Sequence, residues 1–230
     1  MLADDIWRKL VQCSNLALNY HVGNDMLADE INRKLTKTDQ GTGCGSLMRL
    51  YWQPVALTDE LAGNRPVVPV RIFGEDLVLF RNGSGEIGLI DRHCPHRQVD
   101  LCYGRLEENG LRCPFHGWLF APDGTCLDQP GELPENNRVR HFGQANYPCA
   151  ERNGMIFAYL GPGDPPPLPA VDCLQAPDSH VFAFKGFLEC NYLQAVEVGI
   201  DPAHASFLHR YLQDEDLSLI HISEPTRRLN

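Results

Sequence analysis

The stretch from Cys94 to His116 reads CPHRQVDLCYGRLEENGLRCPFH and contains two short clusters of metal-ligand residues. The first is Cys94-Pro95-His96, and the second is Cys113-Pro114-Phe115-His116. Each cluster supplies one soft thiolate and one imidazole. Two loops that lie together in space could therefore hold two irons differently, with both Cys on one iron and both His on the other. The pattern predicts a two-iron cluster held between two loops.

Structural zinc is the alternative for four Cys and His ligands. Zinc fingers pair Cys with Cys and His with His along the sequence, whereas each loop here carries one of each. Pro95 and Pro114 restrict the backbone of the two loops, and Gly117 allows the backbone to approach inorganic sulfide closely. These features favour the iron-sulfur cluster over zinc.

The sequence before the first cluster is typical of short antiparallel strands. Residues 67–92 contain β-rich runs interrupted by turn signals at Phe73–Asp76 and Asn82–Gly85. The second cluster is followed by another turn signal, Pro122–Thr125. We therefore expect both clusters at the tips of loops between strands.

The flanking segments predict further elements. Residues 47–57 suggest a docking helix that leads into an edge strand, and residues 155–160 a last buried strand. The Pro-rich stretch 161–170 cannot join a central strand and marks a domain boundary. A new strand is expected over 181–188, and a mostly helical element over 190–209.

Composition restricts the class of protein. The chain has 230 residues, 43% of them hydrophobic, and a formal net charge of -10 without a Lys/Arg run, which argues against nucleic acid or an anionic membrane as partner. Its nine cysteines are an odd number without a disulfide framework. Neither a membrane-spanning run nor a signal peptide is recognised, so we expect a soluble, cytoplasmic protein.

The two ends of the sequence are unusual. Met1–Leu10 and Met26–Leu35 are near copies, MLADDIWRKL and MLADEINRKL. We expect a duplicated or wrongly extended start with the true beginning at Met26, and a pair of surface helices is the alternative. Residues 217–227, LSLIHISEPTR, match the translation of a sequencing-library adaptor. We expect residues 217–230 to be an adaptor-derived artefact and the genuine sequence to end near Asp216.

A second constellation lies near the C-terminus. Asp201, His204 and His209 form the pattern D-x-x-H-x4-H. Five residues rotate by about 140° on an ideal helix, so the two His share a metal only on a distorted or widened helix. Spacing alone leaves exposed helix histidines as an equal alternative.

The motifs CPHR and CPFHGWLFAPDGTCLDQPGE resemble the Rieske domain of the aromatic-ring-hydroxylating oxygenases, large (alpha) subunit, in the phthalate dioxygenase-like branch. The resemblance implies that Cys94 and Cys113 bind one iron of a [2Fe-2S] cluster, and His96 and His116 the other. It also implies that Trp118 shields the cluster edge. At the position of Gln98 the family more often has Gly.

The segment CNYLQAVEVGIDPAHASFLHR resembles the mononuclear-iron motif of the same branch. This resemblance implies that His204 and His209 are two ligands of a 2-His-1-carboxylate Fe(II), which binds O2 beside the substrate. Asp201 is then no ligand but carries electrons from the Rieske His of a neighbouring subunit. The third, carboxylate ligand is expected outside this sequence, so we expect the chain by itself to be inactive.

The expected fold is α+β and mainly β. An antiparallel Rieske domain with its docking segment, residues 36–165, follows an N-terminal segment, residues 1–35, and precedes the truncated start of a helix-over-sheet catalytic domain, residues 166–216. The expected function is that of an oxidoreductase, the terminal oxygenase that hydroxylates or O-demethylates an aromatic substrate. Its electrons come from NAD(P)H through a ferredoxin or flavin/iron-sulfur reductase, and it forms a homotrimer. A stand-alone Rieske ferredoxin is the alternative.

Overall fold

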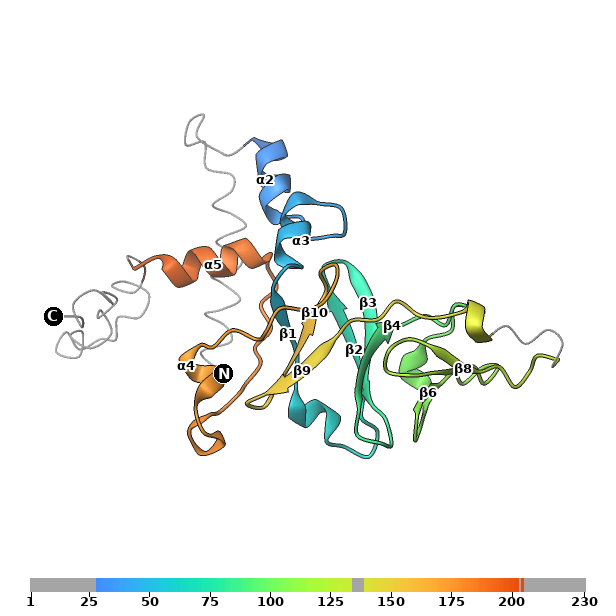
Figure 1. Cartoon of the computed structure of the whole chain (residues 1–230). Helices are drawn as coiled ribbons and strands as arrows, with labels where there is room; N and C mark the ends of the chain where they lie inside the picture. Colours follow the sequence, from blue (N-terminus) through green and yellow to red (C-terminus); the bar gives the residue numbers. More distant parts are fainter. Residues whose placement is uncertain (1–27, 134–138, 203, 205–230) are drawn as a thin grey trace, which may run out of the picture. The chain divides into compact units, whose positions relative to one another are not determined.

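The structure, a computed structural model, describes residues 28–133, 139–202 and 204 (Figure 1). The chain divides into two compact units, residues 1–34 and 35–230, which are described separately. The first unit contributes most of helix α2 (Asp29–Thr36), whose first turn carries acidic and whose last turn carries basic side chains, as the helix dipole favours. The first near copy, Met1–Leu10, and the suspected adaptor segment lie outside the described residues.

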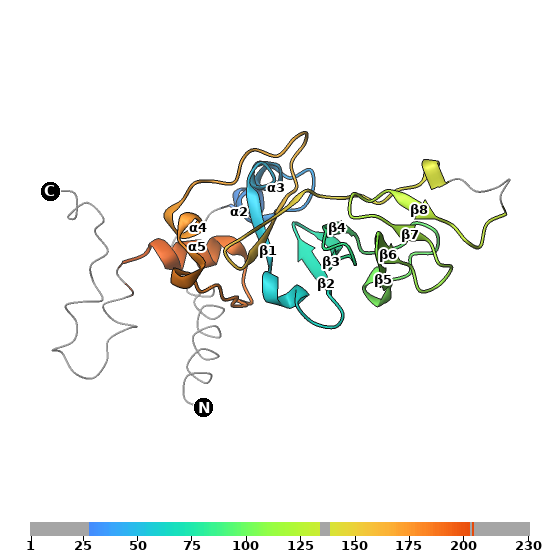
Figure 2. The ribbon, with the colours of Figure 1, turned by 60° about the horizontal axis from the view of Figure 1, so that its bottom comes forward.

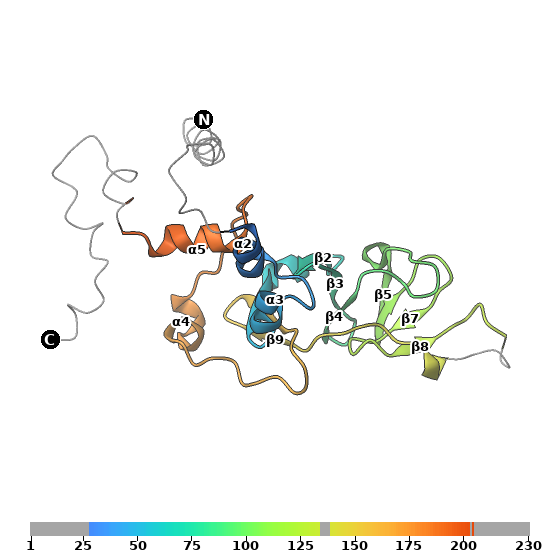
Figure 3. The ribbon, with the colours of Figure 1, turned by 90° about the horizontal axis from the view of Figure 1, so that it is seen from above.

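The described part of the second unit contains ten strands in three antiparallel sheets (Figures 1, 2 and 3). The first sheet has the order β1 (Trp52–Leu57), β10 (Met155–Tyr159), β9 (Cys149–Arg152). The second has the order β2 (Val67–Ile72), β3 (Glu75–Arg81), β4 (Ile87–Asp91). The third has the order β5 (Arg105–Glu107), β6 (Gly110–Arg112), β7 (Leu119–Phe120), β8 (Cys126–Asp128). The expectation of a mainly β fold is confirmed.

Strand β3 is buried on both faces and joins two hydrophobic cores. Successive side chains of a strand point to opposite faces. Leu77 and Leu79 enter the core shared with the first sheet, while Val78 and Phe80 enter the core shared with the third. The third sheet, which carries the second ligand cluster, is therefore packed against the second sheet, which leads into the first cluster.

Two hairpins close with two-residue turns in which both central residues have positive φ. Phe73 (φ 50°) and Gly74 (φ 79°) join β2 to β3, and Asn153 (φ 50°) and Gly154 (φ 76°) join β9 to β10. Such turns match the right-handed twist of the paired strands. The predicted turns at Phe73–Asp76 and Asn82–Gly85 are confirmed.

Several of the flanking predictions are confirmed. Helix α3 (Gly43–Met48) precedes β1, and β1 lies at a sheet edge with an irregularity of register next to Pro54. Strand β10 is the buried central strand of its sheet. Helix α5 (Tyr192–Ile200) forms within the segment predicted to be helical.

The prediction of a strand over 181–188 is wrong. The segment between the short helix α4 (Asp172–Gln175) and α5 contains the 3-10 turn Asp178–His180 and no strand. Apolar side chains predominate there, and the ring of Phe182 is 87% exposed. A strand also needs a neighbouring ladder for its backbone groups, and no described strand pairs with this segment.

The Pro-rich residues 161–170 contain no regular secondary structure. They are held to the first sheet, because Nε1 of Trp52 donates a hydrogen bond of 2.6 Å to the carbonyl of Pro166. The domain bounds 36–165 and 166–216 stay a prediction. Within the described ranges, no helix combines the length and the apolar character that crossing a bilayer requires.

We predict that Phe80→Ala lowers the free energy of unfolding of the metal-free chain by about 3–5 kcal/mol, because it leaves a cavity where two sheets meet. The control is Phe182→Ala, which removes the same ring from the surface and should change stability by less than about 0.5 kcal/mol. Urea unfolding followed by circular dichroism measures both. Equal effects of the two substitutions would contradict the two-core arrangement.

Candidate metal centre

The first ligand loop follows β4 and is closed by its own backbone. The amide of Cys94 donates to the carbonyl of Val99 (2.9 Å), and the amide of Gln98 donates back to the carbonyl of Cys94 (2.8 Å). These two hydrogen bonds fold residues 94–99 into a compact turn. His96 lies at its centre.

The second ligand loop connects β6 to β7 and repeats the same pattern. The amide of Cys113 donates to the carbonyl of Trp118 (2.8 Å), and the amide of Gly117 donates to the carbonyl of Cys113 (3.2 Å). In each loop the first residue is the Cys, and the fifth residue closes the turn onto it. Both clusters therefore lie between strands, as predicted, and on turns of the same construction.

The fifth residue of each loop has a left-handed backbone. Gly117 has φ 76°, and Gln98 has φ 57°. Only Gly adopts this conformation without steric cost. The geometry of the turn thus explains why the family more often has Gly at this position. In this chain Gln98 adopts the same left-handed backbone with strain.

The four predicted ligands separate by burial. Cys94 is 1% and Cys113 4% exposed, whereas His96 is half-buried and His116 is exposed. The two imidazole rings are 4.6 Å apart between centroids. The fold thus brings two thiols together inside the protein and two imidazoles together at its surface.

Burial raises the pKa of the Cys94 thiol to about 11. The backbone amides of His96 and Arg97 donate to this sulfur and act in the opposite direction, while the neighbouring Cys113 raises the pKa further. The free thiol is therefore protonated at neutral pH. Since a metal ligand must be the thiolate, binding of iron here releases a proton.

Trp118 lies against the ligands. Its indole stacks on the ring of His96, with centroids 4.9 Å apart and planes 5° apart, and Phe142 meets its edge at 5.0 Å. Its Nε1 is buried and has no hydrogen-bond acceptor among the described residues. A buried donor beside the ligands suits a site that receives an acceptor such as a sulfide.

The donor set fits a [2Fe-2S] cluster. In the described parts of the chain, no three His, Cys, Asp or Glu side chains converge on a single metal position. The arrangement is instead one pair of thiols and one pair of imidazoles, which is the requirement of a cluster whose two irons each take two protein ligands.

Sequence reasoning missed the charged residues that brace the loops. Before the first loop, Arg92 donates to Asp100 (2.5 Å), whose other carboxylate oxygen accepts from the amide of Cys102 (2.8 Å). The hydrogen bond from Arg92 holds the pKa of Asp100 at about 2. Arg112 and Glu107 form a comparable pair beside the second loop. In the sequence, these residues are marked only by an Arg one or two positions before each Cys. Ordinary surface Arg residues occur at such positions as well, so the sequence does not distinguish the two.

The second constellation is described in part. Asn191 caps α5, because its side chain accepts from the amide of Gln194 (3.2 Å), and the helix ends before Asp201, whose backbone is extended next to Pro202. Oδ2 of Asp201 lies 3.5 Å from Nδ1 of His204. His209 lies outside the described residues.

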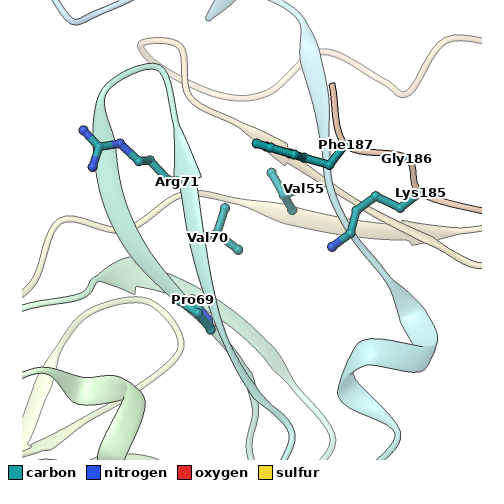
Figure 4. A pocket seen from close by; sticks show the side chains of 7 residues that line it. All are labelled: Val55, Pro69, Val70, Arg71, Lys185, Gly186 and Phe187. Carbon is teal, nitrogen blue, oxygen red and sulfur yellow. The ribbon is translucent and has the colours of Figure 1, made fainter. Parts of the chain in front are cut away.

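A pocket of about 300 Å³ lies elsewhere (Figure 4). Val55 of β1 and residues 69–71 of β2 form one part of its lining, and residues 185–187 form the other. Nζ of Lys185 is bound to Glu60. None of the predicted ligands lines this pocket, so we assign it no part in the metal centre.

Comparison with known proteins bears on the same residues. The sequence profile described as "Rieske [2Fe-2S] domain" matches residues 51–148. The chain is 40% identical over 195 residues to 5,5'-dehydrodivanillate O-demethylase oxygenase subunit of a Sphingobium species, covering 80% of this chain and 44% of the relative. It is 39% identical over 187 residues to phthalate 4,5-dioxygenase oxygenase subunit of Pseudomonas putida, covering 80% of this chain and 42% of the relative.

Among solved structures, the crystal structure of dicamba monooxygenase superimposes with a TM-score of 0.50 and 27% sequence identity. The match covers 57% of this chain and 42% of that chain. The chain thus spans less than half the length of the relatives that it matches.

We predict that Gln98→Gly raises the free energy of unfolding of the metal-free chain by about 0.5–1 kcal/mol. Relief of the left-handed backbone is worth about 1–2 kcal/mol, and the added flexibility of Gly in the unfolded chain offsets about half of it. Gln98→Ala keeps a Cβ and should stay near the unsubstituted chain. Urea unfolding compares the three, and a Gly variant no more stable than the Ala variant would refute the strain.

Proposed function

Since the chain belongs to the family of Rieske [2Fe-2S] proteins, in the branch of the phthalate dioxygenase-like oxygenase subunits, we propose that it acts as the terminal oxygenase component of a ring-hydroxylating system. In this role electrons pass from the cluster to a mononuclear Fe(II). Activation of O2 there leads to hydroxylation or O-demethylation of an aromatic substrate. The observation that carries the proposal is the pairing of two buried thiols and two surface imidazoles on matching loops.

Four side chains would hold the cluster: Cys94 and Cys113 on one iron, His96 and His116 on the other. When bound, the cluster supplies one-electron transfer. Buried Cys94 and Cys113 would keep water from the iron that they bind, whereas exposed His116 would offer an imidazole edge to a redox partner. Trp118 orients His96 by stacking on it. The chain thus separates a protected side of the cluster from a side through which electrons can enter and leave.

His204 and His209 would hold the mononuclear iron, together with a carboxylate. The position of Asp201 supports a role beside the metal and not on it. Because its carboxylate faces Nδ1 of His204 at 3.5 Å, Nε2 would be the ligand atom. A carboxylate behind a ligating imidazole fixes its orientation and makes it a stronger donor. We propose that Asp201 is also the electron path from the Rieske His of a neighbouring subunit.

The alternative of a stand-alone Rieske ferredoxin explains the two loops but not the rest of the chain. The similarity extends over 80% of the chain to proteins named as oxygenase subunits. A carrier of electrons alone has no use for a second iron motif. The oxygenase is therefore the better supported of the two functions.

The partners follow from the proposed role. The relatives are named as subunits of oxygenases, which implies further components. We propose a ferredoxin or flavin/iron-sulfur reductase that delivers electrons from NAD(P)H, a homotrimer in which the electron path crosses between subunits, and a location in the cytoplasm.

We predict that the chain reconstituted anaerobically with iron and sulfide and then reduced shows the Rieske g-value pattern in electron paramagnetic resonance. His96→Ala should abolish this pattern, because one iron loses a ligand. His93→Ala removes a partly exposed imidazole three residues earlier and should preserve it. A zinc-binding protein without this spectrum would contradict the cluster assignment.

We predict that the reconstituted chain, in excess Fe(II), binds iron beyond the two atoms of its cluster. His204→Ala should remove only this additional iron, while the Rieske spectrum and the cluster iron remain. Metal analysis after gel filtration, together with the spectrum, measures both. Additional iron retained in full by the His204→Ala variant would contradict the assignment of His204 as an iron ligand.

A further inference from the structure

The guanidinium of Arg112 lies beside the second ligand loop and contacts three parts of the chain. Its Nε and Nη2 donate to the two carboxylate oxygens of Glu107, at the end of β5, at 2.6 and 2.8 Å. Its Nη1 donates to the carboxylate of Asp128, at the end of β8, at 2.8 Å. The same Nη1 donates to the carbonyl of Gly117, inside the loop, at 2.5 Å.

The geometry of this group is specific to Arg. A planar guanidinium can bind one carboxylate with two parallel hydrogen bonds and still direct its remaining donors elsewhere, which a Lys ammonium cannot do with the same geometry. The Arg112 side chain is 17% exposed. Partial burial makes its charge-assisted hydrogen bonds stronger than those of a fully solvated pair.

The contact with Gly117 reaches the ligand loop itself. Gly117 directly follows His116, has a left-handed backbone, and closes the turn onto the carbonyl of Cys113. A hydrogen bond to its carbonyl fixes the orientation of the peptide that joins Gly117 to Trp118. The hydrogen bond from Arg112 therefore restrains the loop at Gly117, the residue with the greatest backbone freedom.

We propose that Arg112 is a positioning residue, which holds the His116 side of the cluster in place and sets the charge beside it. Glu107 and Asp128 orient the guanidinium, and the guanidinium orients the loop. Its positive charge also balances two carboxylates near the cluster. Without that charge the reduced, more negative cluster is less favoured, so its midpoint potential falls.

Arg105 provides a matched control. It pairs with the same carboxylate oxygen of Glu107, at 2.7 Å, but its side chain is 73% exposed and none of its hydrogen bonds reaches the loop. Removal of either Arg takes one positive charge and one partner from Glu107. Only removal of Arg112 releases Gly117.

The test uses the full chain, reconstituted with iron and sulfide, with the substitutions Arg112→Gln, Arg112→Lys and Arg105→Gln. We expect Arg112→Gln to lose its cluster several-fold faster on dilution into chelator, with altered g values and a lower midpoint potential. Arg112→Lys keeps the charge but not the fork, so it should retain most of the potential while its g values change and its cluster is lost faster. Arg105→Gln should keep the g values and the cluster lifetime of the unsubstituted chain, and its midpoint potential should fall by less than that of Arg112→Gln, because the 73% exposed charge of Arg105 is screened by solvent.

Two results would overturn the proposal. One is that Arg112→Gln and Arg105→Gln have equal effects, since the contact with Gly117 would then contribute nothing. The other is that Arg112→Lys keeps the g values and cluster lifetime of the unsubstituted chain. If Arg112→Gln fails to fold, the Lys variant by itself tests the proposal. The proposal rests on the cluster part of the proposed function. Absence of the Rieske spectrum before any substitution would refute the cluster assignment, whereas its presence with insensitive variants would refute the role of Arg112 alone.

Discussion

The centre depends on one constraint: two thiols must be brought together in a dry interior while two imidazoles, only two or three residues further along the chain, remain at the surface. The chain satisfies this with two turns of the same backbone construction, in which the amide of the fifth residue closes onto the carbonyl of the Cys. The His then lies on the outer part of each turn. Buried Cys94 and Cys113 and exposed His116 are the result.

The two turns come from different sheets, so their separation is set by the packing between sheets. Strand β3 carries this packing because it is buried on both faces. Its Val78 and Phe80 share a core with Trp118, Cys94 and Cys113 themselves. The thiols are therefore part of the hydrophobic core, and the stability of that core and the geometry of the ligands are coupled.

Charged groups complete the support where apolar packing ends. Each loop has an Arg near its start that binds a carboxylate, Arg92 with Asp100 and Arg112 with Glu107. Both pairs are mostly buried, so their hydrogen bonds are less weakened by solvent than those of exposed ion pairs. The main effect of each pair is to fix the orientation of a backbone segment next to a ligand.

The sequence by itself determined the ligand types, the turns around them and the mainly β fold, because these depend on residues close together in the chain. The tertiary structure decided the rest. The contact of Arg112 with Asp128 and the stacking of Trp118 on His96 depend on how separate segments meet. The strand wrongly predicted at 181–188 has the same cause: an apolar, aromatic-rich run is compatible with a strand, but only a neighbouring strand can supply its hydrogen bonds.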